Sequence, residues 1–335
     1  MTHYSVPYLA HRMWIVMNLA PRRSGLGTAL LSAAAFGTSG SFATALIGSG
    51  WSPAAAVTVR LIVAGSVLTV PALLLLRGQL NSLVRQARSI GGFGVVAIAA
   101  GQLCYYNAVA RLSVGVALLL EYLGILLVVG WLWLWHGHRP RRLTVSGAVA
   151  ALVGLVLVLD ITGQQHLDPI GVLWGLGAAF GLASYFVISA QADDAALPPV
   201  VMAWSGLTVG AGTLLLVGLS GALPMHTGAS DVRLLHHRMN WLVPVLGISL
   251  LAAVYAYSAG IRAARLLGAK LASFAGLSEV LFAVLFAWLL LAQLPTFGQL
   301  IGGLFIVGGV ALVRIDDLRR DRAVTPVEPA PVPAG

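Results

Sequence analysis

The sequence predicts an all-α membrane protein, and its composition is the first reason. Of its 335 residues, 59% are hydrophobic and only 9% are charged, with a mean hydropathy of +0.90. Soluble domains carry roughly 25% charged residues. A chain this apolar cannot cover itself with polar surface, so lipid must be its solvent.

The second reason is a series of apolar segments long enough to cross a bilayer, which takes ~20 residues of helix. Helices are expected because strands of this length and apolarity do not form membrane barrels. Ten such segments can be counted, at 25–48, 54–76, 91–110, 112–135, 143–161, 170–190, 199–219, 241–261, 268–291 and 297–314.

The third reason is an internal repeat, in which residues recur 144 positions apart in one block and 155 apart in another. Because each half holds five spans, the second half must be inverted relative to the first, as in many secondary transporters. Chance matches among Gly-rich helices are the less favoured alternative. The matches are Gly27 with Gly171, Phe36 with Phe180, Gly37 with Gly181, Phe42 with Phe186, Pro140 with Pro295, Gly147 with Gly302, and Gly154 with Gly309.

The basic residues predict that both termini lie in the cytoplasm. With the N-terminus inside, sixteen of the 20 Lys and Arg residues fall on the cytoplasmic side and three outside. Such an excess marks the cytoplasmic face of a membrane protein. The net charge of +9 is therefore interpreted as a topology signal, and no nucleic-acid partner is expected.

These features divide the chain into four parts. Residues 1–24 are predicted to be a cytoplasmic tail without a signal peptide. The two five-helix repeats occupy 25–161 and 162–315. Residues 316–335 are predicted to be a disordered cytoplasmic tail, because the chain from Ala323 onward is rich in Pro and Ala.

Two carboxylates lie in the apolar middle of comparable segments. Glu121 belongs to ARLSVGVALLLEYLGILLVVG and Glu279 to ARLLGAKLASFAGLSEVLFAVLF. A carboxylate near the bilayer centre costs ~2.5–3.5 kcal/mol and is usually kept where it faces other helices or a watery cavity. We expect these residues to hold a proton, bind a substrate ammonium group or pair with Arg. The alternative is a protonated or hydrogen-bonded Glu that only joins helices.

Other polar residues in the apolar segments are candidates to line a pore. Arg60 is either an anchor for a substrate carboxylate, a counter-ion to Glu121, or a side chain that snorkels to the interface. The alternative for Tyr105 and Tyr106 is interfacial anchoring, and for the Ser residues it is bonding to their own helix. The remaining candidates are Gln102, Asn107, Tyr255, Tyr257, Ser39, Ser41, Ser184 and Tyr185.

No metal, cofactor or catalytic residue is expected. All eight His fall in tails or loops, Cys104 is the single cysteine, and no P-loop pattern occurs. ATP-driven transport by this chain alone is therefore not expected. Asp193 and Asp194 are the only paired loop carboxylates, which makes an integral-membrane enzyme the least favoured class.

Several stretches resemble the EamA branch of the drug/metabolite transporter superfamily, over about residues 25–315. They are ARLSVGVALLLEYLG, DPIGVLWGLGAAFGLASYFV and LSEVLFAVLFAWLLLAQLPTFGQLIGGLFIVGGVALV. The first-half segment is most similar to the threonine/homoserine exporter branch. The resemblance implies ten helices, a multi-pass location in the cytoplasmic membrane and export of small metabolites.

The expected function is a secondary transporter that exports amino acids or similar small metabolites by alternating access. Its expected partners are a small-molecule substrate, membrane lipid and protons as the coupling ion. Export of drugs or other non-amino-acid metabolites, and uptake, are the alternatives.

Overall fold

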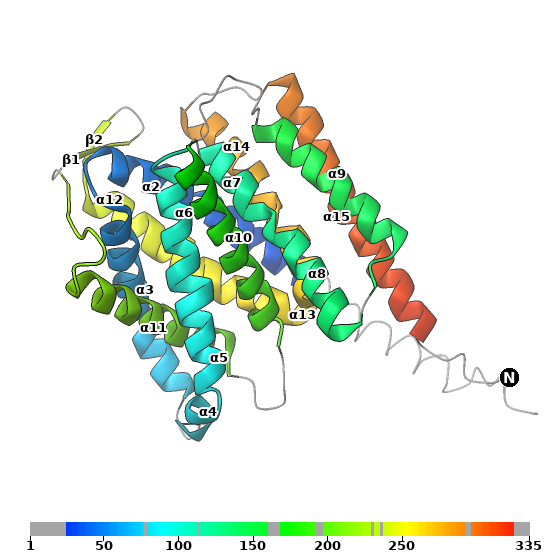
Figure 1. Ribbon diagram of the computed structural model, residues 1–335, viewed down its shortest axis with the longest axis horizontal. Coiled ribbons are helices and arrows are strands. Elements are labelled where there is room, and N and C mark those ends of the chain that lie inside the picture. Colours follow the sequence, from blue (N-terminus) through cyan, green and yellow to red (C-terminus); the bar gives the residue numbers. More distant parts are fainter. Residues whose placement is uncertain are drawn as a thin grey trace, which may run out of the picture.

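The computed structural model describes residues 25–76, 80–112, 114–137, 139–159, 168–191, 197–228, 231–234, 237–291 and 296–324. Within these ranges the chain is a bundle of helices with one short β-hairpin (Figure 1). The predicted N-terminal tail and the Asp193–Asp194 pair lie outside the described residues.

The helices of the first half follow the predicted segments. The first segment is broken at Thr38, whose hydroxyl donates to the carbonyl of Ala35 at 2.7 Å. The elements are residues 25–37, α2 (Ser39–Gly48), α3 (Pro53–Leu75), α4 (Leu80–Arg85), α5 (Ala87–Gly92), the π-helix η1 (Phe93–Ala100), α6 (Gly101–Val109), α7 (Val114–Tyr122), α8 (Gly124–His136) and α9 (Arg142–Leu159).

The second half also follows its predicted segments. It begins where the Asp168 side chain caps a helix by accepting from the amide of Ile170 at 2.9 Å. The elements are α10 (Pro169–Ser189), α11 (Pro199–Leu219), β1 (Asp231–Leu234), β2 (His237–Asn240), α12 (Leu242–Leu246), the π-helix η2 (Gly247–Tyr255), α13 (Ala256–Gly276), α14 (Ser278–Leu291) and α15 (Phe297–Val324).

Eight helices among the described residues are long and apolar enough to cross a membrane. One of them, Leu242–Gly276, runs through two predicted segments and is broken at Gly268, where φ is +78° and ψ is 161°. A side chain at this φ would be strained, so glycine allows the chain to turn there. The helix at Arg142–Val158 is apolar but shorter. The count of ten spans stays a prediction.

The β-hairpin was not predicted from the sequence. It pairs β1 with β2 antiparallel, with Val232 opposite Met239, inside the long connection between α11 and α12. It lies beside α2 at the end of the bundle opposite α4 (Figure 1).

Helices α9 and α15 lie side by side at one edge of the bundle (Figure 1). Glycines make this approach possible: a Cβ on Gly154 would lie 2.5 Å from the carbonyl oxygen of Gly302, and one on Gly147 would lie 2.8 Å from that of Gly309. Such small residues allow helix backbones to touch within a membrane.

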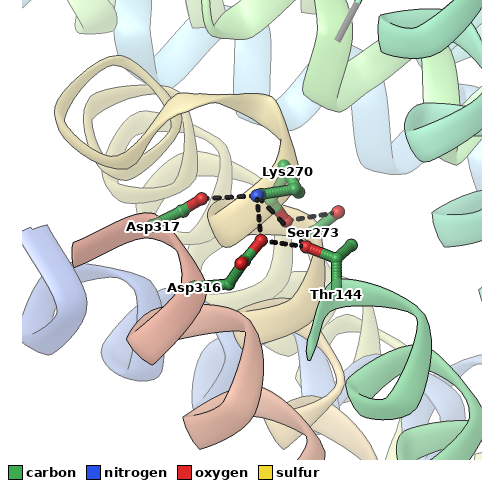
Figure 2. A network of polar contacts seen from close by, with 5 residues as sticks. All are labelled: Thr144, Lys270, Ser273, Asp316 and Asp317. Atoms are coloured by element: carbon green, nitrogen blue, oxygen red, sulfur yellow. Dashed lines mark hydrogen bonds and ion pairs between the residues drawn. The ribbon is translucent and has the colours of Figure 1, made fainter. Parts of the chain in front are cut away.

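A polar network joins α9, α13 and α15 (Figure 2). The Lys270 ammonium lies 2.5 Å from Oδ1 of Asp317 and 3.7 Å from Oδ2 of Asp316, and the Thr144 hydroxyl donates to Asp316 at 2.6 Å. Lys270 thus pairs with two carboxylates of α15.

This network also explains a difference at the C-terminus. Residues 316–324 are helical, where the sequence predicts the start of a disordered tail. Asp316 is only 4% exposed, and its contacts with Lys270 and Thr144 attach α15 at this point to α13 and α9.

Candidate functional site

A cavity of about 60 Å³ lies at the centre of the bundle, with room for a few water molecules. Residues 25–37 and helices α2, η1, α6, α7, α10, α13 and α14 contribute its walls, so both halves of the chain take part. Its polar lining residues are Ser32, Ser39, Gln102, Tyr105, Glu121, Tyr122, Tyr185, Tyr257 and Glu279.

Arg60, on α3, lies beside this cavity but is 0% exposed. Its Nη1 atom donates to Gln102 Oε1 at 2.6 Å, Tyr106 Oη at 3.2 Å and Ser39 Oγ at 3.3 Å. Its Nη2 atom donates to the carbonyl oxygen of Ala252 at 2.5 Å. Arg60 therefore does not snorkel; its guanidinium ties α2, α3, α6 and the π-helix η2 together.

The π-helix η2 contributes directly to this arrangement. Ala252 lies inside η2, and its carbonyl accepts from Arg60. π-Helical turns disturb the regular hydrogen-bond ladder and often occur at functional sites. In η2 the backbone carbonyl of Ala252 is thereby available to accept a hydrogen bond from the buried guanidinium of Arg60.

Glu279 lies in the first turn of α14, Tyr122 is the last residue of α7, and their side chains are hydrogen-bonded. The hydroxyl of Tyr122 lies 2.8 Å from Oε2 of Glu279 and also 2.8 Å from the carbonyl oxygen of Gly276. A phenol has one proton to donate, so it cannot fully satisfy both acceptors at once. If Glu279 carries a proton, it can donate to Tyr122 while Tyr122 donates to Gly276.

Glu121 lines the same cavity one residue before Tyr122. Its side chain is half-buried and makes no hydrogen bond or ion pair within the described ranges of the chain. The cavity thus holds two carboxylic groups, of which one has a protein donor and the other faces open space.

Aromatic rings form another part of the cavity wall. Phe36 and Tyr257 have centroids 5.2 Å apart at an interplanar angle of 83°, and Tyr185 and Tyr257 have centroids 5.6 Å apart at 80°. Phe36 and Tyr185 complete the triangle at 6.4 Å. Such edge-to-face pairs are the favoured geometry for aromatic side chains.

The EamA-like transporter family model matches the chain twice, over residues 23–160 and 169–315. This chain belongs to the EamA-like transporter family. It is a multi-pass membrane transporter, and the two matches correspond to the two repeats.

One curated relative is the uncharacterized inner membrane transporter YicL of Salmonella typhimurium. It is 27% identical over 243 residues, which cover 71% of this chain and 77% of the relative. A crystal structure with 20% sequence identity superposes with a TM-score of 0.68, covering 88% of this chain and 99% of that one. The second likeness shows the fold alone.

In this EamA-like transporter, several residues predicted for the pore lie together at the cavity. Glu121, Glu279, Gln102, Ser39, Tyr105, Tyr185 and Tyr257 line it. Tyr105 and Tyr106 are 5% and 0% exposed, so neither is an interfacial anchor.

Besides Arg60 and Tyr106, four further predicted residues do not line the cavity. Tyr255 is 45% exposed, and Ser41 is also exposed. Ser184 donates to the carbonyl of Phe180 in its own helix, and Asn107 donates to that of Leu103. These bonds give the Ser184 hydroxyl and the Asn107 amide nitrogen a backbone acceptor within their own helices.

Sequence reasoning missed Tyr122, Ser32 and Gly260 as parts of the site. Tyr122 follows Glu121 directly, and a hydroxyl in an apolar helix needs a partner, so its position was a usable signal. Ser32 donates to the carbonyl of Ala256 at 2.8 Å. Gly260 lines the cavity where a Cβ would collide with the Tyr185 hydroxyl.

Proposed function

We propose that this EamA-like transporter exports small metabolites from the cytoplasm by alternating access, with amino acids such as threonine as the first substrates to test. The observation that carries the proposal is the central cavity, to which both repeats contribute a carboxylic residue. Glu121 comes from the first repeat and Glu279 from the second. A site at the interface of two repeats is what a rocking mechanism requires.

Contacts between α9 and α15 support the inverted repeat. The sequence matches Gly147 with Gly302 and Gly154 with Gly309, while in space Gly147 meets Gly309 and Gly154 meets Gly302. Exchanging each residue for its match turns one contact into the other. A two-fold axis between the repeats would have this effect, as it does in an isologous dimer interface.

The two π-helices support the same relationship. η1 begins at Phe93 and η2 at Gly247, 154 residues later, close to the spacing of the matched glycines. Each π-helix lies in the third segment of its repeat. With five spans in each repeat, the excess of basic residues supports an orientation with both termini in the cytoplasm.

Protons are the proposed coupling ion. Glu279 and Tyr122 form a pair whose hydrogen bonds rearrange when the carboxyl gains a proton, because Tyr122 faces two acceptors. Glu121 is open to the cavity and accessible to a proton or a substrate cation. A protonatable residue within the membrane is a usual part of a proton relay.

The test is efflux from preloaded cells, with labelled amino acids and with or without an imposed proton gradient. The wild type should lose its substrate faster than cells that lack it, and Glu121→Gln and Glu279→Gln should each reduce this flux. Tyr255→Phe, at an exposed position away from the cavity, is the control. Wild-type flux from both Gln variants at equal expression would remove the carboxylic residues from the mechanism.

A further inference from the structure

Four exposed arginines are found at the end of the bundle where α9 begins. The end of α8, the start of α9 and the end of α15 all lie at this end (Figure 1). Within the described ranges of the chain, none of the four guanidinium groups makes a hydrogen bond or an ion pair. We refer to these residues together as the basic surface, and they are Arg139, Arg141, Arg142 and Arg319.

The register between α9 and α15 brings two of these arginines to facing positions. The helices are antiparallel, so residue numbers rise along α9 while they fall along α15, as the glycine contacts between them show. Thr144 faces Asp316 in this register and donates to its carboxylate at 2.6 Å. One helical turn further toward the same end stand Arg141 and Arg319. Two positive charges thus lie on neighbouring helix ends, where they repel each other unless an anion lies between them.

The nearby acidic side chains do not balance the basic surface. Those that the structure describes on α15 belong to Asp316 and Asp317, and both pair with Lys270 of α13 (Figure 2). The first turn of α9 contains no acidic residue. A helix N-terminus itself carries a partial positive charge, so arginines placed there add to that charge instead of balancing it. The basic surface therefore requires an anion from outside the described part of the chain.

Aromatic and aliphatic side chains beside the basic surface indicate that this anion belongs to a lipid. The last turns of α8 expose Trp131, Trp133 and Trp135 by 38%, 50% and 66%, and the rings of Trp131 and Trp135 stack with centroids 4.3 Å apart. Tryptophans of this kind lie at the level of the lipid headgroups. On α9, the turns that follow the arginines expose Val145 by 48% and Val149 by 56%, which gives acyl chains an apolar surface.

We infer that the start of α9 and the end of α15 form a binding site for an anionic phospholipid. Arg141 and Arg319 hold its phosphate between them, and its acyl chains lie along the exposed valines of α9. Guanidinium groups bind phosphate oxygens in pairs, and basic sites between membrane helices are known to bind anionic headgroups. This site lies outside the central cavity, so the inference goes beyond the proposed transport function and does not depend on it.

The test titrates purified full-length protein in a neutral detergent with dioleoylphosphatidylglycerol or dioleoylphosphatidylcholine, which share their acyl chains. Native mass spectrometry counts the bound lipids. The anionic lipid is expected to bind about tenfold or more tightly than the zwitterionic one, because two arginines meet its phosphate without an opposing cation. Equal binding of the two lipids would overturn the site. Glycerol 3-phosphate should not displace the lipid at equal concentration, and equal competition would overturn the assignment to a lipid.

Variants locate the site. The double variant Arg141→Gln/Arg319→Gln should bind dioleoylphosphatidylglycerol about tenfold more weakly than the wild type. The matched control, Arg85→Gln/Arg88→Gln, removes two exposed charges from α4 and α5 and should bind it like the wild type. An equal loss in both double variants would indicate attraction by net charge alone and overturn the site.

Thermal unfolding shows whether the variant is folded. Because Arg141 and Arg319 have no partner among the described residues, the double variant should unfold at the wild-type midpoint or above it when no lipid is added. Dioleoylphosphatidylglycerol should then raise the midpoint of the wild type and not that of the variant. If the double variant does not fold, the single variants Arg141→Gln and Arg319→Gln replace it, and wild-type lipid binding in both would overturn the inference.

Discussion

The hydroxyl of Tyr122 lies 2.8 Å from the carboxyl oxygen of Glu279, and it joins the end of α7 to the start of α14. The same hydroxyl faces the carbonyl of Gly276 at 2.8 Å. The pair thus connects a residue of the first repeat to one of the second within the cavity wall. Whatever changes the proton on Glu279 changes this contact between the repeats.

Tyr122→Phe is therefore expected to lower flux without unfolding the protein. The ring remains to fill the wall, but Glu279 and the Gly276 carbonyl lose their shared donor. One lost hydrogen bond of this kind costs about 1–3 kcal/mol, which the bundle should tolerate. Efflux per molecule is measured beside Tyr255→Phe, and equal flux from the two variants would contradict a role for this hydroxyl.

Arg60→Lys is expected to lower the free energy of unfolding by about 2 kcal/mol or more. Lysine keeps the charge, but its single nitrogen cannot reach all the acceptors that the guanidinium joins, and buried polar groups without partners cost about 1–3 kcal/mol each. Thermal unfolding in detergent measures the loss. Arg262→Lys, at an exposed position, is the matched control and should leave the midpoint unchanged.

Gly154→Ala is expected to destabilise the contact between α9 and α15. The new methyl group would lie 2.5 Å from the carbonyl oxygen of Gly302, and forcing a methyl group into a close-packed contact costs about 1–3 kcal/mol. Gly308→Ala, on α15 with nothing within 4 Å of its Cβ, should be neutral or gain up to about 1 kcal/mol. Equal midpoints for both variants would argue against this packing.

Lys270→Met is expected to loosen α15. Asp316 would lose its cation and retain only the Thr144 hydroxyl, at a cost of about 1–3 kcal/mol for a partly buried group. Limited proteolysis near residue 316 and thermal unfolding report the change. Asp317→Asn leaves the Lys270–Asp316 pair in place and should therefore show a smaller effect than Lys270→Met.

Asp168 should contribute to the stability of the folded protein, and this contribution should be lost at low pH. The Arg111 guanidinium, 3.1 Å away, and the amide of Ile170 hold the pKa of Asp168 below its usual range. A lowered pKa in the folded state stabilises the protein above the unfolded-state pKa, and this is lost as pH falls through the folded-state pKa. Unfolding midpoints of the wild type and Asp168→Asn should thus converge as pH falls below that range, and a constant difference would contradict the contribution.

Part of the site could be predicted from the sequence, because the energetic cost of burying a charged side chain can be recognised within a single apolar segment. A carboxylate or guanidinium within an apolar run needs a partner wherever the run lies, which singles out Glu121, Glu279 and Arg60. The family, the apolar segments and the membrane location follow from similarly local signals. The partner of each buried polar group cannot be predicted from the neighbouring sequence, because the partners are contributed by other helices.

The sequence by itself determined that this chain is a membrane protein, that it is a member of the EamA-like transporter family and that it places charged side chains in apolar segments. The tertiary structure decided that Arg60 pairs with Gln102, Tyr106 and the Ala252 carbonyl, leaving Glu121 facing the cavity. The physical reason is that the rotation and crossing of packed helices select the contacts. Hydropathy along one segment carries no information about residues of a helix nearly 200 positions away.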